Sequence, residues 1–215
     1  MRRIHTNRTE EPKVLRPLTA VVLSALLVAV PVSAQVAWDS PALLSPTVPS
    51  GFSIFLVEPA GGDLGAMGTL RHSVGPVGMG YRAGIAEESG PSGDVAVSGG
   101  VDVSGIMARG VEGSEVDVMW WAGGGLSVGS DWVVSGPAGI ILGWSGAGDD
   151  VIFSPYGGAH VVFSLSGNDG NAVDFAGVVD LGLDLVLPSG WMIRAGASIG
   201  DFESIAVGVK IPGGS

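Results

Sequence analysis

Few residues of this chain have the spacing that catalysis requires. Gly125-Leu126-Ser127-Val128-Gly129 fits the G-x-S-x-G pattern, in which a strand-to-helix turn presents a nucleophilic serine. No segment with helical periodicity follows Ser127, and a chain with 37 glycines produces such matches by chance. His160 could serve Ser127 or Ser164 as a general base if an aspartate oriented its ring, which is the chemistry of a hydrolase. A lone histidine in a narrow interior is more often a hydrogen-bonded filler, so we expect no catalytic residue.

Metal and cofactor signatures are equally sparse. The turn at residues 167–171 and the pair Asp149-Asp150 offer oxygen ligands, but their spacing misses the twelve-residue calcium loop and fits hairpin turns instead. Gly78-Met79-Gly80 followed by Ala83 imitates a dinucleotide fingerprint without the helix that binds the pyrophosphate. The absence of cysteine excludes disulfides, thiolate metal sites and a lipidated cysteine anchor. We therefore expect no metal and no cofactor.

Charged residues recur at every second position of several segments, and apolar residues occupy the positions between them. We call each of these two sets of alternate positions a parity. The set comprises Arg82, Asp102, Asp117, Asp174, Asp180, Asp184, Arg194 and Lys210. Tyr156 and His160 are expected on the same side, because alternate side chains of a strand point to opposite faces. We predict that these groups lie inside the fold, where the charges pair in a network. The surplus of acids in this set favours a wet interior that accepts cations.

The elements that would hold these residues are strands. Alternation with period two recurs from Gly51 almost to the C-terminus; in one run Met79, Tyr81 and Ile85 oppose Gly80 and Arg82. Turn signals separate the runs at Gly61-Gly62, Gly75-Pro76, Gly90-Pro91, Gly113-Ser114, Ser130-Asp131, Gly148-Asp149, Gly167-Asn168, Ser189-Gly190 and Gly200-Asp201. The pattern predicts an all-β chain of about ten strands, with eight as the alternative.

Composition distinguishes a membrane barrel from a soluble sandwich, since both alternate. The chain is 46% hydrophobic and 14% charged, with a mean hydropathy of +0.46, and its polar parity is mainly glycine, serine, alanine and some aspartate. Small inward residues suit a narrow lumen, and ring closure removes the exposed edge strands. We therefore predict a closed antiparallel up-and-down transmembrane β-barrel. Trp120, Trp132, Trp144 and Trp191 would form its aromatic girdle at the membrane interface.

The first 34 residues have the features of a signal peptide. A basic segment precedes the apolar stretch Leu18–Val30, and Pro31-Val32-Ser33-Ala34 places small residues where a signal peptidase reads them, so we expect cleavage after Ala34. An uncleaved membrane anchor is the alternative. The proline-containing residues 35–50 are expected to form an extended lead-in, and residues 51–212 the barrel. Removal of residues 1–34 leaves five basic and nineteen acidic residues, a net charge of −14 that argues against nucleic acid as a partner.

Two segments carry a resemblance to a known group of proteins. Ser154-Pro155-Tyr156-Gly157-Gly158-Ala159-His160 looks like a Pro-Tyr-x-Gly-x-Gly segment of a middle-to-late strand, and Ala206–Ile211 is similar to a closing strand. The chain thus resembles the small outer-membrane β-barrel proteins of Gram-negative-type bacteria, of the OmpA/OmpX-like or opacity type, from about Gly51 to Pro212. It departs from them at its end, because Ile211-Pro212-Gly213-Gly214-Ser215 lacks the terminal aromatic residue that the barrel-assembly machinery reads.

The resemblance and the weak site signals together give an expected function. We expect a non-enzymatic protein of the cell outer membrane with a structural, adhesive or surface-interaction role. Its partners would be outer-membrane lipid, the barrel-assembly machinery during biogenesis, and an extracellular ligand that the sequence does not identify. The alternatives are a narrow, cation-favouring, porin-like channel, an outer-membrane lipid hydrolase that uses Ser127 and His160, and a soluble secreted β-sandwich.

Overall fold

The fold was described from a computed structural model of the chain. The structure describes residues 38–47, 50–74, 77–88, 94–110, 115–144, 151–167 and 173–212. The predicted signal peptide, and therefore its cleavage site, lies outside the described residues. So do the acidic pair Asp149-Asp150, most of the turn at residues 167–171, and the predicted turn residues 75–76, 90–91, 113–114 and 148. Within the described part of the chain, no helix is long and apolar enough to cross a membrane.

The described residues form ten β-strands and no helix, which confirms the all-β prediction and its preferred strand count. The strands are β1 (Gly51–Glu58), β2 (Gly62–Val74), β3 (Val77–Glu88), β4 (Val95–Ala108), β5 (Val116–Val128), β6 (Trp132–Trp144), β7 (Ile152–Ser166), β8 (Val173–Val186), β9 (Met192–Gly200) and β10 (Ser204–Lys210). Among the described residues, the predicted turns at Gly61-Gly62, Ser130-Asp131, Ser189-Gly190 and Gly200-Asp201 lie between or at the ends of consecutive strands. Gly61 and Gly190 occupy two of these turns with φ of 70° and 82°, a left-handed conformation that suits glycine.

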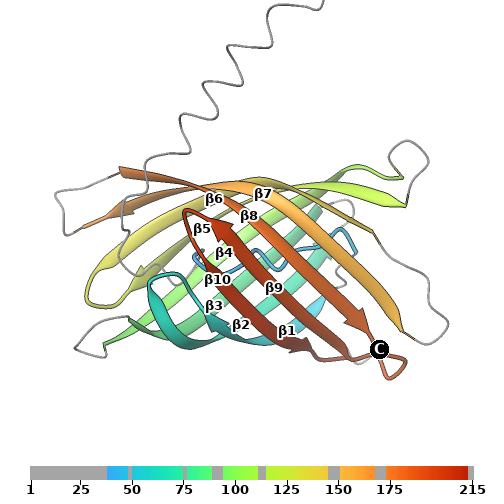
Figure 1. The fold of residues 1–215 in the computed structure, drawn as a ribbon, viewed down its shortest axis with the longest axis horizontal. Coiled ribbons are helices and arrows are strands. Elements are labelled where there is room, and N and C mark those ends of the chain that lie inside the picture. Colours follow the sequence, from blue (N-terminus) through green and yellow to red (C-terminus); the bar gives the residue numbers. More distant parts are fainter. Residues whose placement is uncertain are drawn as a thin grey trace, which may run out of the picture. The chain divides into compact units, whose positions relative to one another are not determined.

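The strands close into a barrel with up-and-down order (Figure 1). Each strand pairs antiparallel with its neighbours in sequence, and β1 pairs with β10 from Ser53↔Lys210 to Glu58↔Ile205. No strand of the ring is left with an open edge, so its backbone groups are satisfied without another chain. The predicted closed antiparallel barrel is therefore confirmed.

Alternation divides the barrel into an apolar outer face and an inner face that mixes polar and apolar side chains. Large apolar side chains on the outer face of every strand stay exposed, such as Leu56 at 62%, Val101 at 52% and Leu181 at 54%. Serines, glycines and charged residues of the opposite parity point inward and are largely buried. A water-soluble sandwich places its apolar parity inside, so this arrangement is the reverse of that alternative.

The chain before β1 lies inside the ring of strands. Residues 38–45 are all buried, and Trp38, Leu43 and Leu44 belong to the hydrophobic clusters of the interior. Strand β1 does begin at Gly51, where the sequence analysis starts the fold. Residues 38–45 form no strand or helix but are part of the core, because their apolar side chains fill space that the small inward residues of the wall leave.

Candidate functional site

The candidate site is the barrel lumen together with residues 38–47, which we call the luminal segment. In Figure 1 this blue part of the chain runs within the ring of strands without forming a strand. The backbone carbonyl of Asp39 accepts a hydrogen bond from Ala60 N, in the turn after β1. At its other end, Pro46 lies against Gly143, beside the last residue of β6. Since the end of β1 and the end of β6 belong to opposite ends of the barrel, the segment extends along the lumen.

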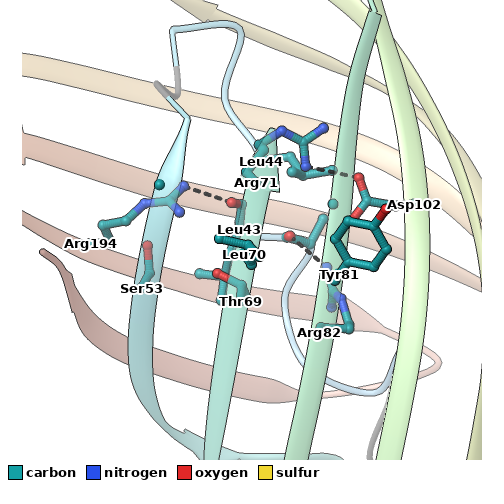
Figure 2. A pocket seen from close by; sticks show the side chains of 13 residues that line it. Leu43, Leu44, Ser53, Thr69, Leu70, Arg71, Tyr81, Arg82, Asp102 and Arg194 are labelled. Atoms are coloured by element: carbon teal, nitrogen blue, oxygen red, sulfur yellow. Dashed lines mark hydrogen bonds and ion pairs between the residues drawn. The ribbon is translucent and has the colours of Figure 1, made fainter. Parts of the chain in front are cut away.

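Three side chains of the wall hold the backbone of the luminal segment. Arg82 of β3 donates from Nη2 to the carbonyl of Ala42 at 3.0 Å, and Arg194 of β9 donates from Nη2 to the carbonyl of Leu43 at 2.6 Å (Figure 2). Asp180 of β8 accepts from the backbone N–H of Ala42 at 3.4 Å. These charge-assisted bonds satisfy backbone groups that a segment without secondary structure would otherwise bury unpaired. Leu43 has a φ of 52°, a strained conformation for leucine that the surrounding contacts maintain.

Trp38 fills the lumen on the side of β4 and β5. The guanidinium of Arg82 lies 3.9 Å from the centroid of its ring, and Trp121 packs beside it with a centroid distance of 5.7 Å. Gly100, Gly123 and Gly125 face the indole so closely that a Cβ on any of them would lie 2.7–3.1 Å from its atoms. The wall therefore has glycine where the indole requires room, which explains part of the glycine-rich inward parity.

A second contact forms on the side of β1, β2 and β9. Leu43 packs into a buried cluster with Phe55, Val57, Met67 and Ala206. A Cβ at position 196 would lie 2.9 Å from Leu43 Cδ2 and 3.2 Å from Pro41 Cβ, whereas the nearest backbone atom of the wall would be 3.6 Å away. A side chain at position 196 would thus clash with the luminal segment and not with the neighbouring strand.

Buried charge pairs surround the luminal segment. Arg71 Nη1 lies 2.8 Å from Asp102 Oδ1, and Arg194 Nε lies 2.8 Å from Asp184 Oδ1. His160 Nδ1 lies 3.0 Å from Asp180 Oδ2, and Ser198 Oγ donates to the other oxygen of Asp180 at 2.6 Å. Buried charges are stable only when paired and hydrogen-bonded, and here the same groups also hold the segment.

The structure places six of the eight predicted lumen charges inside: Arg82, Asp102, Asp180, Asp184, Arg194 and Lys210. Tyr156 and His160 are also buried there. The other two, Asp117 and Asp174, share the inward parity but lie at strand ends and are only partly buried. Asp117 forms an ion pair of 3.4 Å with the exposed Arg109 and accepts a hydrogen bond from Gly110 N. The prediction that Asp117 joins the internal network is thus wrong, because its partners belong to the loop after β4.

Acidic surplus is found at one end of the barrel and not in its interior. The end formed by the turns after β1, β3, β5, β7 and β9, which we call the acidic rim, carries Glu58, Asp63, Glu87, Glu88, Asp94, Asp131, Asp174, Asp201 and Glu203. The five basic residues after residue 37 are Arg71, Arg82, Arg109, Arg194 and Lys210, and they lie midway along the barrel or toward the opposite rim. The expected cation-favouring environment is therefore a property of the acidic rim.

The geometry does not assemble the residues of the hydrolase alternative. Ser127 pairs with Val133 of β6, and His160 pairs with Gly139 of the same strand. Six residues of a strand separate these levels by roughly 20 Å, and Ser164 lies four residues along β7 from His160, roughly 13 Å away. His160 has the aspartate that would orient its ring, but neither serine is within reach of it.

The four tryptophans of the predicted girdle point outward. Trp120, Trp132, Trp144 and Trp191 are 38–45% exposed. Trp132 and Trp144 are the first and last residues of β6 and so lie at opposite ends of the barrel, while Trp191 directly precedes β9. Amphipathic rings at both ends of an apolar outer face are typical of a girdle at two membrane interfaces.

Several site residues escaped the sequence analysis. Arg71 and Trp121 lie on the inward parity of β2 and β5, so strict alternation within each strand would have found them. Trp38, Ala42 and Leu43 carried no such signal, because the luminal segment has no periodicity. Among the described residues, no group of three or more His, Cys, Asp or Glu side chains could hold a metal ion.

Comparison with known proteins gives no family for the chain: neither a protein-family model nor a curated protein matches it.

Proposed function

We propose that this protein resides in the bacterial outer membrane as a β-barrel with a structural, adhesive or surface-interaction role and without catalysis. One observation carries the proposal: a closed ring of strands exposes large apolar side chains around its whole outer face. In water such a surface would promote association between copies of the protein, whereas in a membrane its contact with lipid acyl chains is favourable. Strands of 12–15 residues, which include β2 through β8, are long enough to cross a hydrocarbon layer at a tilt.

The leader supports the proposed location. A cleavable signal peptide would deliver the chain to the periplasm, and the barrel-assembly machinery would then insert it among outer-membrane lipids. We also propose kinship with the small outer-membrane barrels on the basis of the segment at Ser154–His160 and the closing strand. In this chain the closing strand is β10, Ser204–Lys210.

A role without catalysis fits the interior. The lumen is occupied by the chain's own residues, and the cavity beside Leu43, Arg82 and Arg194 has a volume of only about 20 Å³. This is room for about one water molecule and not for a lipid substrate. The rims then remain the surfaces through which an extracellular ligand would be bound. A narrow channel is the second candidate, because the wall around the segment is rich in serine and charge.

The test is expression of the full chain in a Gram-negative host, followed by isolation of outer membranes. We expect the protein in that fraction, with an N-terminus at Gln35 and a faster electrophoretic mobility before boiling than after, since closed barrels resist unfolding until heated. Leu181→Asp, on the outer face, should reduce the amount of the heat-modifiable form more than the control variant Ser130→Asp at the rim. Recovery of the protein in the soluble periplasm would overturn the proposal.

A further inference from the structure

We infer that the luminal segment is a displaceable plug and that the lumen it closes is an ion pathway. This inference rests on the membrane location proposed above. It concerns a function that the closed structure conceals: passage of small ions along the barrel axis once residues 38–47 leave their place.

The barrel does not need the luminal segment for closure. Every strand is paired on both sides by other strands, and the ring is completed by β1 and β10. The segment contributes no strand to this ladder and is tied to the wall by the side chains of Arg82, Asp180 and Arg194 and by the turn at Ala60. Its departure would therefore break these contacts and leave the backbone hydrogen bonds of the ring intact.

The luminal segment obstructs the lumen together with inward side chains of the wall such as Phe55 and Trp121. A vestibule of about 410 Å³ lies toward the opposite rim, where Arg71, Ser104 and Arg109 line it together with Ser45 and Pro46 of the segment. Next to Leu43 and Leu44, only the cavity of about 20 Å³ remains. The vestibule thus ends at the luminal segment, and the free space decreases where Leu43 and its neighbours fill the bore.

The wall behind the segment is suited to water and ions. It carries the ion pairs of Arg71 with Asp102 and of Arg194 with Asp184, together with inward hydroxyls. These buried serines are Ser53, Ser98, Ser104, Ser127, Ser135, Ser154, Ser164, Ser198 and Ser204. These hydroxyls and charges favour hydration of the bore once its filler leaves, although apolar wall side chains such as Phe55 and Trp121 line it too, whereas a purely apolar bore would dewet.

Glycine at position 196 provides a way to displace the segment without disturbing the strands. A leucine there would extend into the space of Leu43 and Pro41, while the wall backbone stays at ordinary contact distance from the new Cβ. Overpacking of this kind shifts an equilibrium toward the displaced state by about tenfold or more. Gly124→Leu is the matched control, because a Cβ at position 124 meets only Ser135 O, at 3.9 Å.

A disulfide can hold the segment in place, since the chain has no native cysteine. Ser40 Oγ lies 3.7 Å from Met67 Sδ of β2. A cysteine sulfur at position 67 would lie one atom nearer the backbone than the Met67 sulfur, so a short bis-methanethiosulfonate reagent, which forms a reducible disulfide with each thiol, is used to join Ser40→Cys to Met67→Cys. In planar bilayers we expect the wild type and Gly124→Leu to stay closed and Gly196→Leu to conduct. Cross-linking the two cysteines in the Gly196→Leu background should abolish the current, and reduction of the link should restore it.

Each other result decides against the plug. Equal currents in the wild type and Gly196→Leu, or a current in Gly196→Leu that the disulfide does not reduce, would show that the segment does not gate the bore. An inserted, heat-modifiable Gly196→Leu barrel without current would show that the lumen is no pathway. If Gly196→Leu fails to fold, Trp38→Ala provides a second opening variant, because it empties the space between Gly100 and Gly123.

A second readout does not depend on the membrane. Ser53→Cys places a thiol in the buried wall beside Leu43 and Arg194. In detergent solution, a small water-soluble maleimide should label this thiol about tenfold or more faster in the Gly196→Leu background than in the Gly124→Leu background. Equal labelling rates would refute displacement of the segment. Failure to insert into bilayers despite unequal labelling would count against the membrane proposal and leave the plug supported.

Discussion

Loss of Arg194 is the perturbation for which the structure gives the clearest magnitude. The Arg194 and Asp184 side chains are 3% and 1% exposed, and two nitrogens of the guanidinium bond both oxygens of the carboxylate, at 2.8 and 3.3 Å. Arg194→Met would leave the carboxylate of Asp184 buried without its partner and the carbonyl of Leu43 without its donor. Breaking a buried ion pair costs about 3–5 kcal/mol of unfolding free energy, so we expect a loss within this range.

Two matched variants separate charge from packing. Arg109→Met removes an ion pair of 3.4 Å whose arginine side chain is 73% exposed, and such surface pairs contribute about 0–1 kcal/mol. The double variant Arg194→Met/Asp184→Leu removes both buried charges. It should recover part of the loss and retain a deficit of about 1–3 kcal/mol, because the carbonyl of Leu43 still lacks its donor.

The assay is reversible denaturant unfolding of the protein in lipid vesicles, followed by the fluorescence of its six tryptophans. The expected order of stability is wild type and Arg109→Met, then the double variant, then Arg194→Met. If Arg194→Met were as stable as Arg109→Met, the argument that the pair with Asp184 is buried and required would be refuted. A double variant less stable than Arg194→Met would refute the argument that the isolated charge causes the loss.

Two further predictions concern the outer and inner faces. Val101→Arg, on the outer face of β4, should lower the free energy of unfolding in vesicles by about 2–4 kcal/mol, because arginine at the membrane midplane is unfavourable. The control Glu58→Arg at the acidic rim should lower it by about 0–1 kcal/mol. Similar losses for the two variants in denaturant titrations would contradict the proposed lipid face. The second prediction uses chains that retain a single tryptophan and a quencher attached to the lipid acyl chains. The quencher should reduce the fluorescence of Trp144, which is 45% exposed, and leave that of Trp38 and Trp121, each 2% exposed, nearly unchanged. Comparable quenching of Trp121 and Trp144 would place Trp121 outside the lumen.

The barrel could be predicted from the sequence because its main signal is local. In an antiparallel strand the side chains alternate whatever the strand pairs with, so Val101 and Asp102 are assigned to opposite faces before the pairing is known. The turn residues Gly61 and Gly190 similarly mark strand ends through their own backbone preferences. These local rules suffice for the strand order of an up-and-down ring, in which consecutive strands are neighbours.

The contents of the lumen could not be predicted in this way. The contacts of Trp38 come from Arg82, Gly100 and Trp121, which are distant in sequence and converge only after the ring has closed. Asp117 is instead wrongly assigned to the internal network. Like Asp102 it lies at an inward position of its strand, but near the strand end, where it pairs with a loop residue. Parity predicts the face of a strand on which a side chain lies, and it carries no information on depth along the barrel axis.

The enclosure of the basic residues gives the folded protein an unusual digestion pattern. Trypsin cuts after lysine and arginine, and beyond residue 37 these residues number five. Arg71, Arg82, Arg194 and Lys210 lie within strands, and Arg109 alone among the five follows a strand end with its side chain 73% exposed. Limited digestion should therefore nick the native chain once, after Arg109, and the two fragments should remain together because β4 and β5 each keep their other neighbours. Complete digestion would begin only after the barrel unfolds.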